Sequence, residues 1–249
     1  MIQALTIFRK ELISNRQSLA EVLPQHLPVE RLNRTVISCI KGNLKLLECD
    51  RASLWRAVTT AAVFGVEVDG RQSVILPYKG RAQLVIMVSG LISLAYNAGF
   101  MIDAQVVRQA DEFSYELGLD PWLKHVPANG QGRGIDNPVV GSYAISWPIG
   151  HRADRVFDYL DLPDIIARRD ISAAWRAKGM KSLWGTDFPA MSRKSAVRSR
   201  ANHLPWQVQK AEELEGRADR GENTWAEKMP DGEINIEGEV VDGDATNGE

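Results

Sequence analysis

The 249-residue sequence lacks most features of secreted, membrane-spanning and metal-stabilised proteins. It has only two cysteines, Cys39 and Cys49, which fits a reducing cytosol better than a disulfide scaffold. It has no run of 18 apolar residues, and the charged N-terminus contains no apolar stretch typical of secretory signals. The histidines are scattered, and neither CxxC nor HExxH occurs. We therefore expect a cytoplasmic protein with no membrane partner and no bound metal.

Motifs of common enzyme classes are also absent. The lack of GxxxxGK[ST] excludes ATP-driven strand exchange of the P-loop kind, and there is no GxSxG. The GQGRG run at residues 130–134 does not have the glycine spacing of a dinucleotide-binding loop. A metal-dependent nuclease would need clustered carboxylates, and the candidates have no diagnostic spacing: Asp103, Asp111, Asp158 and Asp161. The sequence thus predicts no catalytic residue and no cofactor, and we expect the protein not to be an enzyme.

Charge is distributed unevenly along the chain, although the net charge is only −2. Residues 212–249 hold 13 acidic residues and three basic ones, whereas residues 1–211 hold 27 basic and 19 acidic residues. The excess is largest in residues 163–211, with ten basic residues against three acidic ones. A basic body with an acidic tail indicates a polyanionic partner, with solubility as the alternative explanation.

The order of the expected elements is helices, then antiparallel strands, then helices, which indicates an α+β fold. Apolar spacing predicts helices over 28–42, 50–65 and 90–99 and again over 161–170 and 189–203. Period-two runs predict a protruding β-hairpin at 73–88, two strands within 100–117, and strands at 138–147 and 155–162. Residues 118–137 are expected to form a loop and residues 171–187 an irregular basic stretch. We predict one α+β domain over 1–211 and a disordered acidic tail over 212–249.

The expected helix near the C-terminus carries a basic group of side chains. At 100° per residue, Val197, Ala201 and Leu204 fall with Ala190 on one narrow apolar face. Four cations flank this face, in pairs on either side: Lys194 with Arg198, and Arg193 with Arg200. Such a helix can approach a sheet closely and present its cations to a phosphate backbone. A solvated basic helix without a DNA contact explains the same pattern equally well.

The turn of the predicted hairpin is a second candidate contact. Tyr78, Lys79 and Arg81 place a ring and two cations at one tip, which suits single-stranded nucleic acid. The cations would follow the backbone while the ring of Tyr78 stacks on a base. Burial of Tyr78 in the core beside Pro77 is the alternative. A weaker cluster of the same kind is formed by Trp122, Lys124 and His125.

Four segments in this order resemble the RecT family of phage-type single-strand DNA annealing proteins, over roughly residues 25–206. They are the helical pair at 28–70, the hairpin and helix at 75–99, and DEFSYELG at 111–118 with HVP at 125–127. The most specific is the fourth, W-x2-D-x3-M-x-R-K-[ST]-A-x-R. Its residues here are Trp184, Asp187, Met191, Arg193, Lys194, Ser195, Ala196 and Arg198. Ser195 stands where the family more usually has Thr.

The resemblance implies an ATP-independent annealing protein of a bacterial host cell that acts in recombination. Members bind single-stranded DNA, pair complementary strands through an annealed duplex intermediate, and assemble into rings or helical filaments. They act with a partner exonuclease, and the acidic tail could dock that nuclease or a host single-strand binding protein. We expect Lys79, Arg81, Arg193, Lys194, Arg198 and Arg200 to line the DNA groove. A passive single-strand binding protein and an unrecognised metal-dependent nuclease remain alternatives.

Overall fold

The computed structural model describes residues 2–129 and 136–204, which form two compact units that divide between Leu94 and Ala95. Helices are combined with antiparallel sheets, so the predicted α+β class is confirmed. The predicted tail at 212–249 lies outside the described residues, and a single annealing domain over 1–211 stays a prediction. None of the helices in the described ranges has the length and hydropathy to cross a lipid bilayer.

The first unit begins with helices whose ends follow the expected signals. They are α1 (Ile2–Ser14), α2 (Arg16–Val22), α3 (Val29–Gly42) and α4 (Arg51–Phe64), with the short 3-10 helix η1 (Leu44–Leu47) between the last two. The side chain of Asp50 accepts a hydrogen bond from Ser53 N at 2.8 Å and caps the start of α4. Gly65 ends α4 in the left-handed conformation, as predicted.

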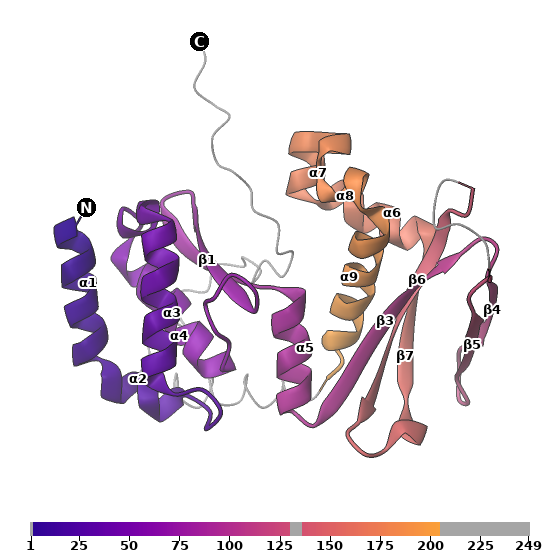
Figure 1. Ribbon diagram of the computed structural model, residues 1–249, viewed down its shortest axis with the longest axis horizontal. Helices are drawn as coiled ribbons and strands as arrows, with labels where there is room; N and C mark the ends of the chain where they lie inside the picture. Colours follow the sequence, from indigo (N-terminus) through magenta and orange to yellow (C-terminus); the bar gives the residue numbers. More distant parts are fainter. Residues whose placement is uncertain (1, 130–135, 205–249) are drawn as a thin grey trace, which may run out of the picture. The chain divides into compact units, whose positions relative to one another are not determined.

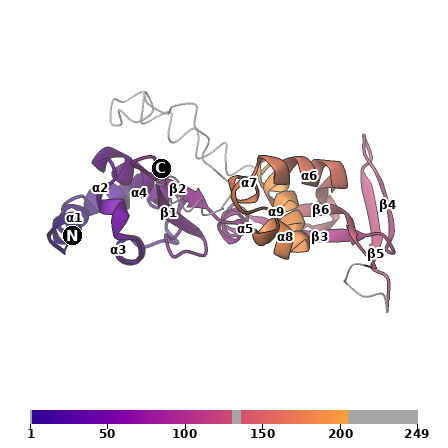
Figure 2. The same ribbon diagram turned by 90° about the horizontal axis from the view of Figure 1, so that it is seen from above.

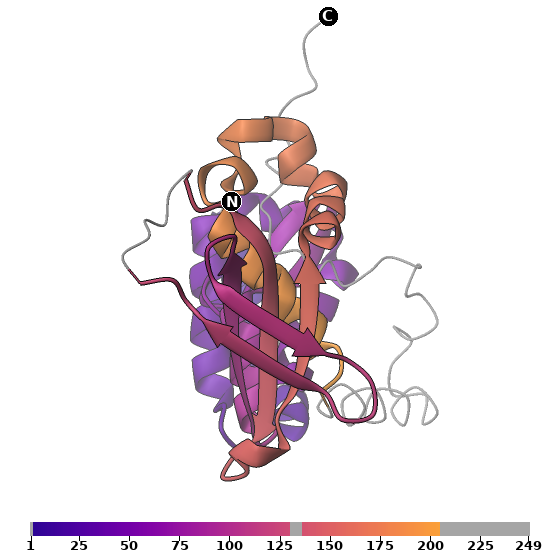
Figure 3. The same ribbon diagram turned by 90° about the vertical axis from the view of Figure 1, so that its right-hand side faces the viewer.

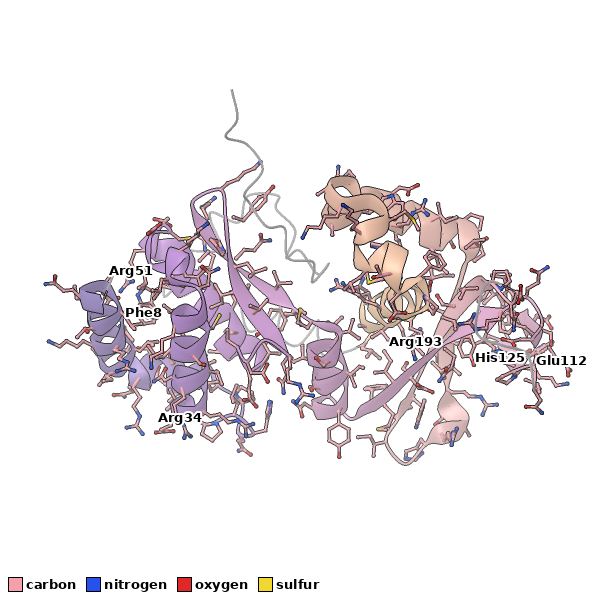
Figure 4. All side chains as sticks on the ribbon, turned by 45° about the horizontal axis from the view of Figure 1, so that its top comes forward. Phe8, Arg34, Arg51, Glu112, His125 and Arg193 are labelled. Carbon is pink, nitrogen blue, oxygen red and sulfur yellow. The ribbon has the colours of Figure 1, made fainter. Side chains whose placement is uncertain are left out.

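The core of this unit lies between α1, α3 and α4. The apolar stripe of α3 is buried at Leu32, Val36 and Ile40, and α4 contributes Leu54 and Val58. On α1, the ring of Phe8 is also buried, and the guanidinium of Arg51 lies 4.5 Å from its centroid (Figure 4). The carboxylate of Glu11 accepts hydrogen bonds from Arg51 and from Trp55 Nε1, at 3.1 and 3.0 Å.

The predicted hairpin is formed by β1 (Ser73–Tyr78) and β2 (Arg81–Ile86), and α5 (Val88–Asn97) follows it. Its antiparallel register runs from the pair Ser73 and Ile86 to the pair Tyr78 and Arg81. Strand β2 packs on α4, and Ile75 of β1 and Leu84 of β2 are buried. The hairpin is therefore fixed to the helical layer along its length.

The second unit is built on a three-stranded antiparallel sheet. Its strands are β3 (Phe100–Arg108), β6 (Val139–Pro148) and β7 (Val156–Asp161), in the order β3-β6-β7. Helix α9 (Phe188–Ala201) covers one face, and a separate hairpin of β4 (Glu112–Glu116) and β5 (Trp122–Val126) covers the other (Figures 1 and 2). Helices α6 (Leu162–Ile171), α7 (Ala173–Lys178) and α8 (Leu183–Thr186) lead from β7 to α9, with η3 (Gly179–Lys181) between the last two short ones.

Strand β6 separates the two faces by residue size. Ser142, Ala144 and Ser146 are buried beneath α9, and their small side chains let the helix lie close to the strand. Tyr143, between them, points to the other face, where its ring stacks on Phe113 of β4 with centroids 6.0 Å apart. Gly141 permits a second aromatic contact, because a Cβ there would lie 2.3 Å from the hydroxyl oxygen of Tyr159.

Two expectations about the second unit are wrong. Residues 118–137, predicted as loop, contain β5, whose inward side chains are Leu123 and the polar His125. In a five-residue strand with one polar inward residue, apolar and polar side chains do not alternate clearly, so the sequence does not indicate a strand. Residues 171–187, predicted as irregular, contain α7, η3 and α8. Each of these helices is shorter than two turns, so an apolar period cannot be read from the sequence.

Candidate nucleic-acid interface

The hairpin tip of the first unit exposes all three residues that the sequence singles out there. Lys79 and Gly80 form a two-residue turn in which both φ angles are positive, 47° and 76°. Tyr78 is 50% exposed, which excludes the alternative that it is a core residue. The ammonium of Lys79 lies 5.3 Å from the centroid of the Tyr78 ring, and Arg81 is exposed opposite it. The tip thus presents one ring and two cations together.

Hydrogen bonds to the start of α4 hold this tip in place. The carbonyl of Gly80 accepts from Asp50 N at 2.9 Å, and Ser53 Oγ accepts from Ala82 N at 2.8 Å. Ser53 Oγ in turn donates to the carbonyl of Asp50 at 2.6 Å. Since Asp50 also caps α4, the helix end and the turn share one network. Cations on such a tip lose little conformational freedom of the backbone on binding.

Helix α9 is positioned by its N-terminal cap and by its buried face. Asp187 accepts a hydrogen bond from Ala190 N at 3.1 Å, and Pro189 follows in the first turn. Val197, Ala201 and Leu204 are buried as predicted, and Ala190 is half-buried. Across the contact, Ser142 Oγ donates to the carbonyl of Ser192 at 3.0 Å. The predicted close approach of helix and sheet is confirmed.

The four cations of α9 do not share one environment. Arg193 is exposed and Lys194 is half-buried, whereas Arg198 and Arg200 are each only 8% exposed (Figure 4 labels Arg193). The expectation that all four fringe the apolar face is therefore wrong for Arg198 and Arg200. Arg200 lies where the helix meets the sheet, because the small side chains of β6 leave room for a long one beside them.

Arg200 has a defined structural role. Its Nε donates to Ser146 Oγ at 2.9 Å, and its Nη1 lies 3.1 Å from Asp158 Oδ1 on β7. The guanidinium thereby joins α9 to two neighbouring strands. The apolar period of α9 alone could not identify this partner, because Asp158 lies 42 residues earlier in the chain.

The six predicted DNA-binding residues are divided between the two units. Lys79 and Arg81 belong to the first, together with the predicted stacking residue Tyr78, and the four cations of α9 belong to the second. The structure brings the members of each group together. A single groove lined by both groups stays a prediction.

The three residues of the weaker cluster around Trp122 have three different roles. The indole nitrogen of Trp122 donates to Glu116 at 2.8 Å, and Lys124 pairs with Glu112, both on the outer face of the β4–β5 hairpin. His125 points inward instead, with its side chain only 6% exposed (Figure 4). These residues therefore do not form one exposed cluster.

His125 lies at the centre of a buried network that sequence reasoning missed. Its Nε2 is 3.0 Å from Asp111 Oδ2 and its Nδ1 is 3.0 Å from the hydroxyl of Tyr143. Asp111 also accepts hydrogen bonds from the backbone N–H groups of Arg108 and Ala128, both within 3.0 Å. Burial raises the pKa of the Tyr143 hydroxyl, with the charges of Asp103 and Asp111 adding to the effect. The network fastens the β4–β5 hairpin to the sheet.

The carboxylates considered for a nuclease have other partners, and Asp103 accepts a hydrogen bond from Ala104 N at 2.9 Å. Asp158 pairs with Arg200, Asp111 bonds to His125, and Asp161 caps α6 through Asp164 N at 2.9 Å. Over residues 2–129 and 136–204, no three His, Cys, Asp or Glu side chains are grouped as a metal site would require.

The arrangement defines an α+β protein whose exposed ring and cations suit contact with a nucleic-acid backbone. Comparison with known proteins gives the family. The model of the RecT family matches residues 30–227. Protein RecT of Escherichia coli (strain K12) is 30% identical over 208 residues, covering 79% of this chain and 74% of that protein. This chain belongs to the RecT family, which supports a role in DNA recombination through binding and annealing of single strands.

Proposed function

We propose that the protein pairs complementary DNA single strands without ATP, acting as an oligomer, and that it holds each strand by its backbone. The β1–β2 tip supplies Lys79 and Arg81 for phosphates, with Tyr78 stacking on a base. Arg193 and Lys194 of α9 supply further contacts. Arg200 acts mainly by fixing α9 to the sheet, and Arg198 stays a predicted DNA contact. The observation that carries this proposal is the exposed, hydrogen-bonded tip of ring and cations in a member of the RecT family.

The physics of annealing needs no covalent step. Two strands repel through their phosphates, and neutralising these charges lowers that barrier. Base edges must stay free to pair, so the protein contacts should go to the backbone and to base faces. The tip exposes side chains with these properties.

The acidic tail over 212–249 is a candidate docking segment for a partner exonuclease or a single-strand binding protein.

Binding of the intact protein to single-stranded oligonucleotides across a salt series tests this proposal. If about five phosphates are neutralised per protomer, the slope of log K against log salt is about −3.5. The same slope should be found for unrelated sequences and without ATP. A flat salt response, or an absolute need for ATP, would contradict the proposal.

Integrity of the DNA distinguishes the nuclease alternative. Labelled single and double strands incubated with the protein and Mg²⁺ or Mn²⁺ should stay full-length. Cleavage that depends on either metal would contradict the proposed function and indicate a metal-dependent nuclease.

A further inference from the structure

Two exposed surfaces of the second unit have opposite charge. The first, here called the acidic tip, is the loop end of the β4–β5 hairpin over residues 116–122. Its apolar side chains face solvent, with Leu119 fully exposed and Leu117 63% exposed. Glu116 and Asp120 are exposed beside them, and this segment contains no Lys or Arg. Exposed leucines on a hairpin that already packs its other face are not needed for the core of the unit.

The second surface, here called the basic corner, is formed by residues 171–183 across α7, η3 and the start of α8. Its exposed apolar side chains are Ile171, Met180 and Leu183, of which Met180 is 70% exposed. The exposed cations are Arg176, Lys178 and Lys181, and the segment contains no Asp or Glu. Exposed apolar groups rimmed by charge of one sign are a candidate interaction site.

Both surfaces are held in shape by their own contacts. The base of the acidic tip is closed by the hydrogen bond from Trp122 Nε1 to Glu116, at 2.8 Å. In the basic corner, Ser182 Oγ donates to the carbonyl of Gly179 at 2.6 Å. Gly185 packs so closely that a Cβ there would lie 2.3 Å from the carbonyl oxygen of Met180. Ordered surfaces bind at a lower entropic cost than flexible ones.

We infer that the acidic tip of one copy of this chain docks on the basic corner of a second copy. Leucines of the tip would pack against the exposed Met and Leu of the corner, and the carboxylates would meet the cations. Within the second unit the two surfaces lie far apart, with α7 at one end of the sheet and the tip towards the other (Figures 1 and 3). Because the surfaces differ, the contact is head-to-tail and repeats from copy to copy, which gives a ring or a filament.

The inference rests on the proposed function, in which several copies act on one strand. Both surfaces are small, which places the contact at the low end of interface sizes. We therefore expect assembly that depends on protein concentration and weakens with salt. Alignment of copies along DNA would strengthen it, since neighbours on one strand have a high effective concentration.

Sedimentation velocity of the full chain without DNA, over a concentration series, tests the contact by exchange of charge. A corner variant carries Arg176→Glu and Lys181→Glu, and a tip variant carries Asp120→Lys, with Glu116 kept because it closes the base of the tip. Each variant alone should raise the concentration for half-assembly by at least about tenfold, because like charges then meet. An equimolar mixture of the two should recover assembly near the wild-type concentration, as should a chain with all three substitutions.

Matched controls separate the contact from general effects. Arg152→Glu with Arg155→Glu changes the charge of the same unit by the same amount on its exposed β6–β7 turn, and should leave assembly unchanged. Leu119→Ser should weaken assembly without a change of charge. All variants alter exposed side chains, so thermal unfolding should match the wild type.

The inference is overturned if the wild-type chain stays monomeric, if either variant assembles like the wild type, or if the mixture does not recover. A corner variant that assembles normally but binds DNA weakly would make the corner a DNA site. If the basic corner instead binds the acidic segment 212–249, the corner variant should also assemble like the wild type. A separate annealing measurement distinguishes the two proposals. Normal annealing without this assembly would contradict only the tip–corner contact. Assembly without annealing would contradict only the proposed function.

Discussion

Arg193 and Arg200 lie on the same helix but meet different surroundings. Arg193 is exposed, whereas the guanidinium of Arg200 bonds to Ser146 and Asp158 beneath α9. Removing Arg200 leaves the Asp158 carboxylate largely buried without its cation, so Arg200→Ala should lower the free energy of unfolding by about 3 kcal/mol. Urea unfolding measures this loss. Arg193→Ala is the control and should leave the midpoint unchanged; equal midpoints for both variants would contradict a structural role for Arg200.

The cations of the β1–β2 tip should act on DNA and not on stability. Lys79→Ala and Arg81→Ala should each weaken binding equally for every DNA sequence and reduce the salt slope by about 0.7, the single-strand value per phosphate. Fluorescence anisotropy in a salt series measures both quantities. Lys10→Ala, an exposed cation on α1, is the matched control. Unchanged affinity and slope in both folded tip variants would move the contact elsewhere.

At the scale of elements, strand β6 explains how α9 reaches the sheet. Ala144 is fully buried in a cluster with Met191 and Ala196 of the helix. Ala144→Leu inserts three carbons where no space exists and should lower the free energy of unfolding by about 1–3 kcal/mol. Ile145→Leu, at the next position and on the opposite face, should have less effect. Denaturant midpoints compare the two, and equal shifts would contradict close packing beneath α9.

The β4–β5 hairpin carries a dependence on pH through Asp111. Burial works to raise the pKa of this carboxyl, but hydrogen bonds from Ala128 N–H, His125 and Arg108 N–H outweigh it, and the pKa is lowered. The unfolded chain therefore takes up this proton first as pH falls. The stabilisation is present above about pH 4 and is lost as pH falls through the lowered folded-state pKa.

Asp111→Asn provides the measurement. The difference in unfolding free energy between the wild type and this variant should be largest near neutral pH and should shrink below about pH 4. Asp120→Asn, at the exposed loop of the same hairpin, is the control. A difference that stays constant from neutral to acidic pH would contradict the assigned role of Asp111.

Local sequence signals predicted the elements that have a regular spacing of apolar residues or capping residues at their ends. Asp50 and Gly65 bound α4, and Lys79-Gly80 defines the β1–β2 turn, because each acts within a few residues. Strand β5 and the short helices α7 and α8 depend on contacts far along the chain, so no local pattern reveals them. The same reason explains which parts of the candidate site could be predicted from the sequence. The exposed tip was predictable from its turn, whereas the burial of Arg200 depends on its contacts with Ser146 and Asp158 on distant strands.

At the scale of the whole molecule, we expect the acidic tail and the basic body to have opposite effects on the affinity for DNA. Deleting residues 212–249 removes 13 acidic and three basic residues, so affinity for single strands should be equal or higher, most clearly at low salt. Thermal unfolding should remain cooperative with an unchanged midpoint. Loss of the cooperative transition in the truncated chain would show that the tail is part of the fold.

The most direct test of the account is the rate at which two complementary, fluorescently labelled strands pair in the presence of the protein. We expect the wild-type chain to speed pairing well above the spontaneous rate, with no ATP, and Lys79→Ala combined with Arg81→Ala to lose most of that acceleration while staying folded. Lys10→Ala should pair strands like the wild type. Binding of the single strands without any acceleration of pairing would contradict the account and leave a passive single-strand binding protein.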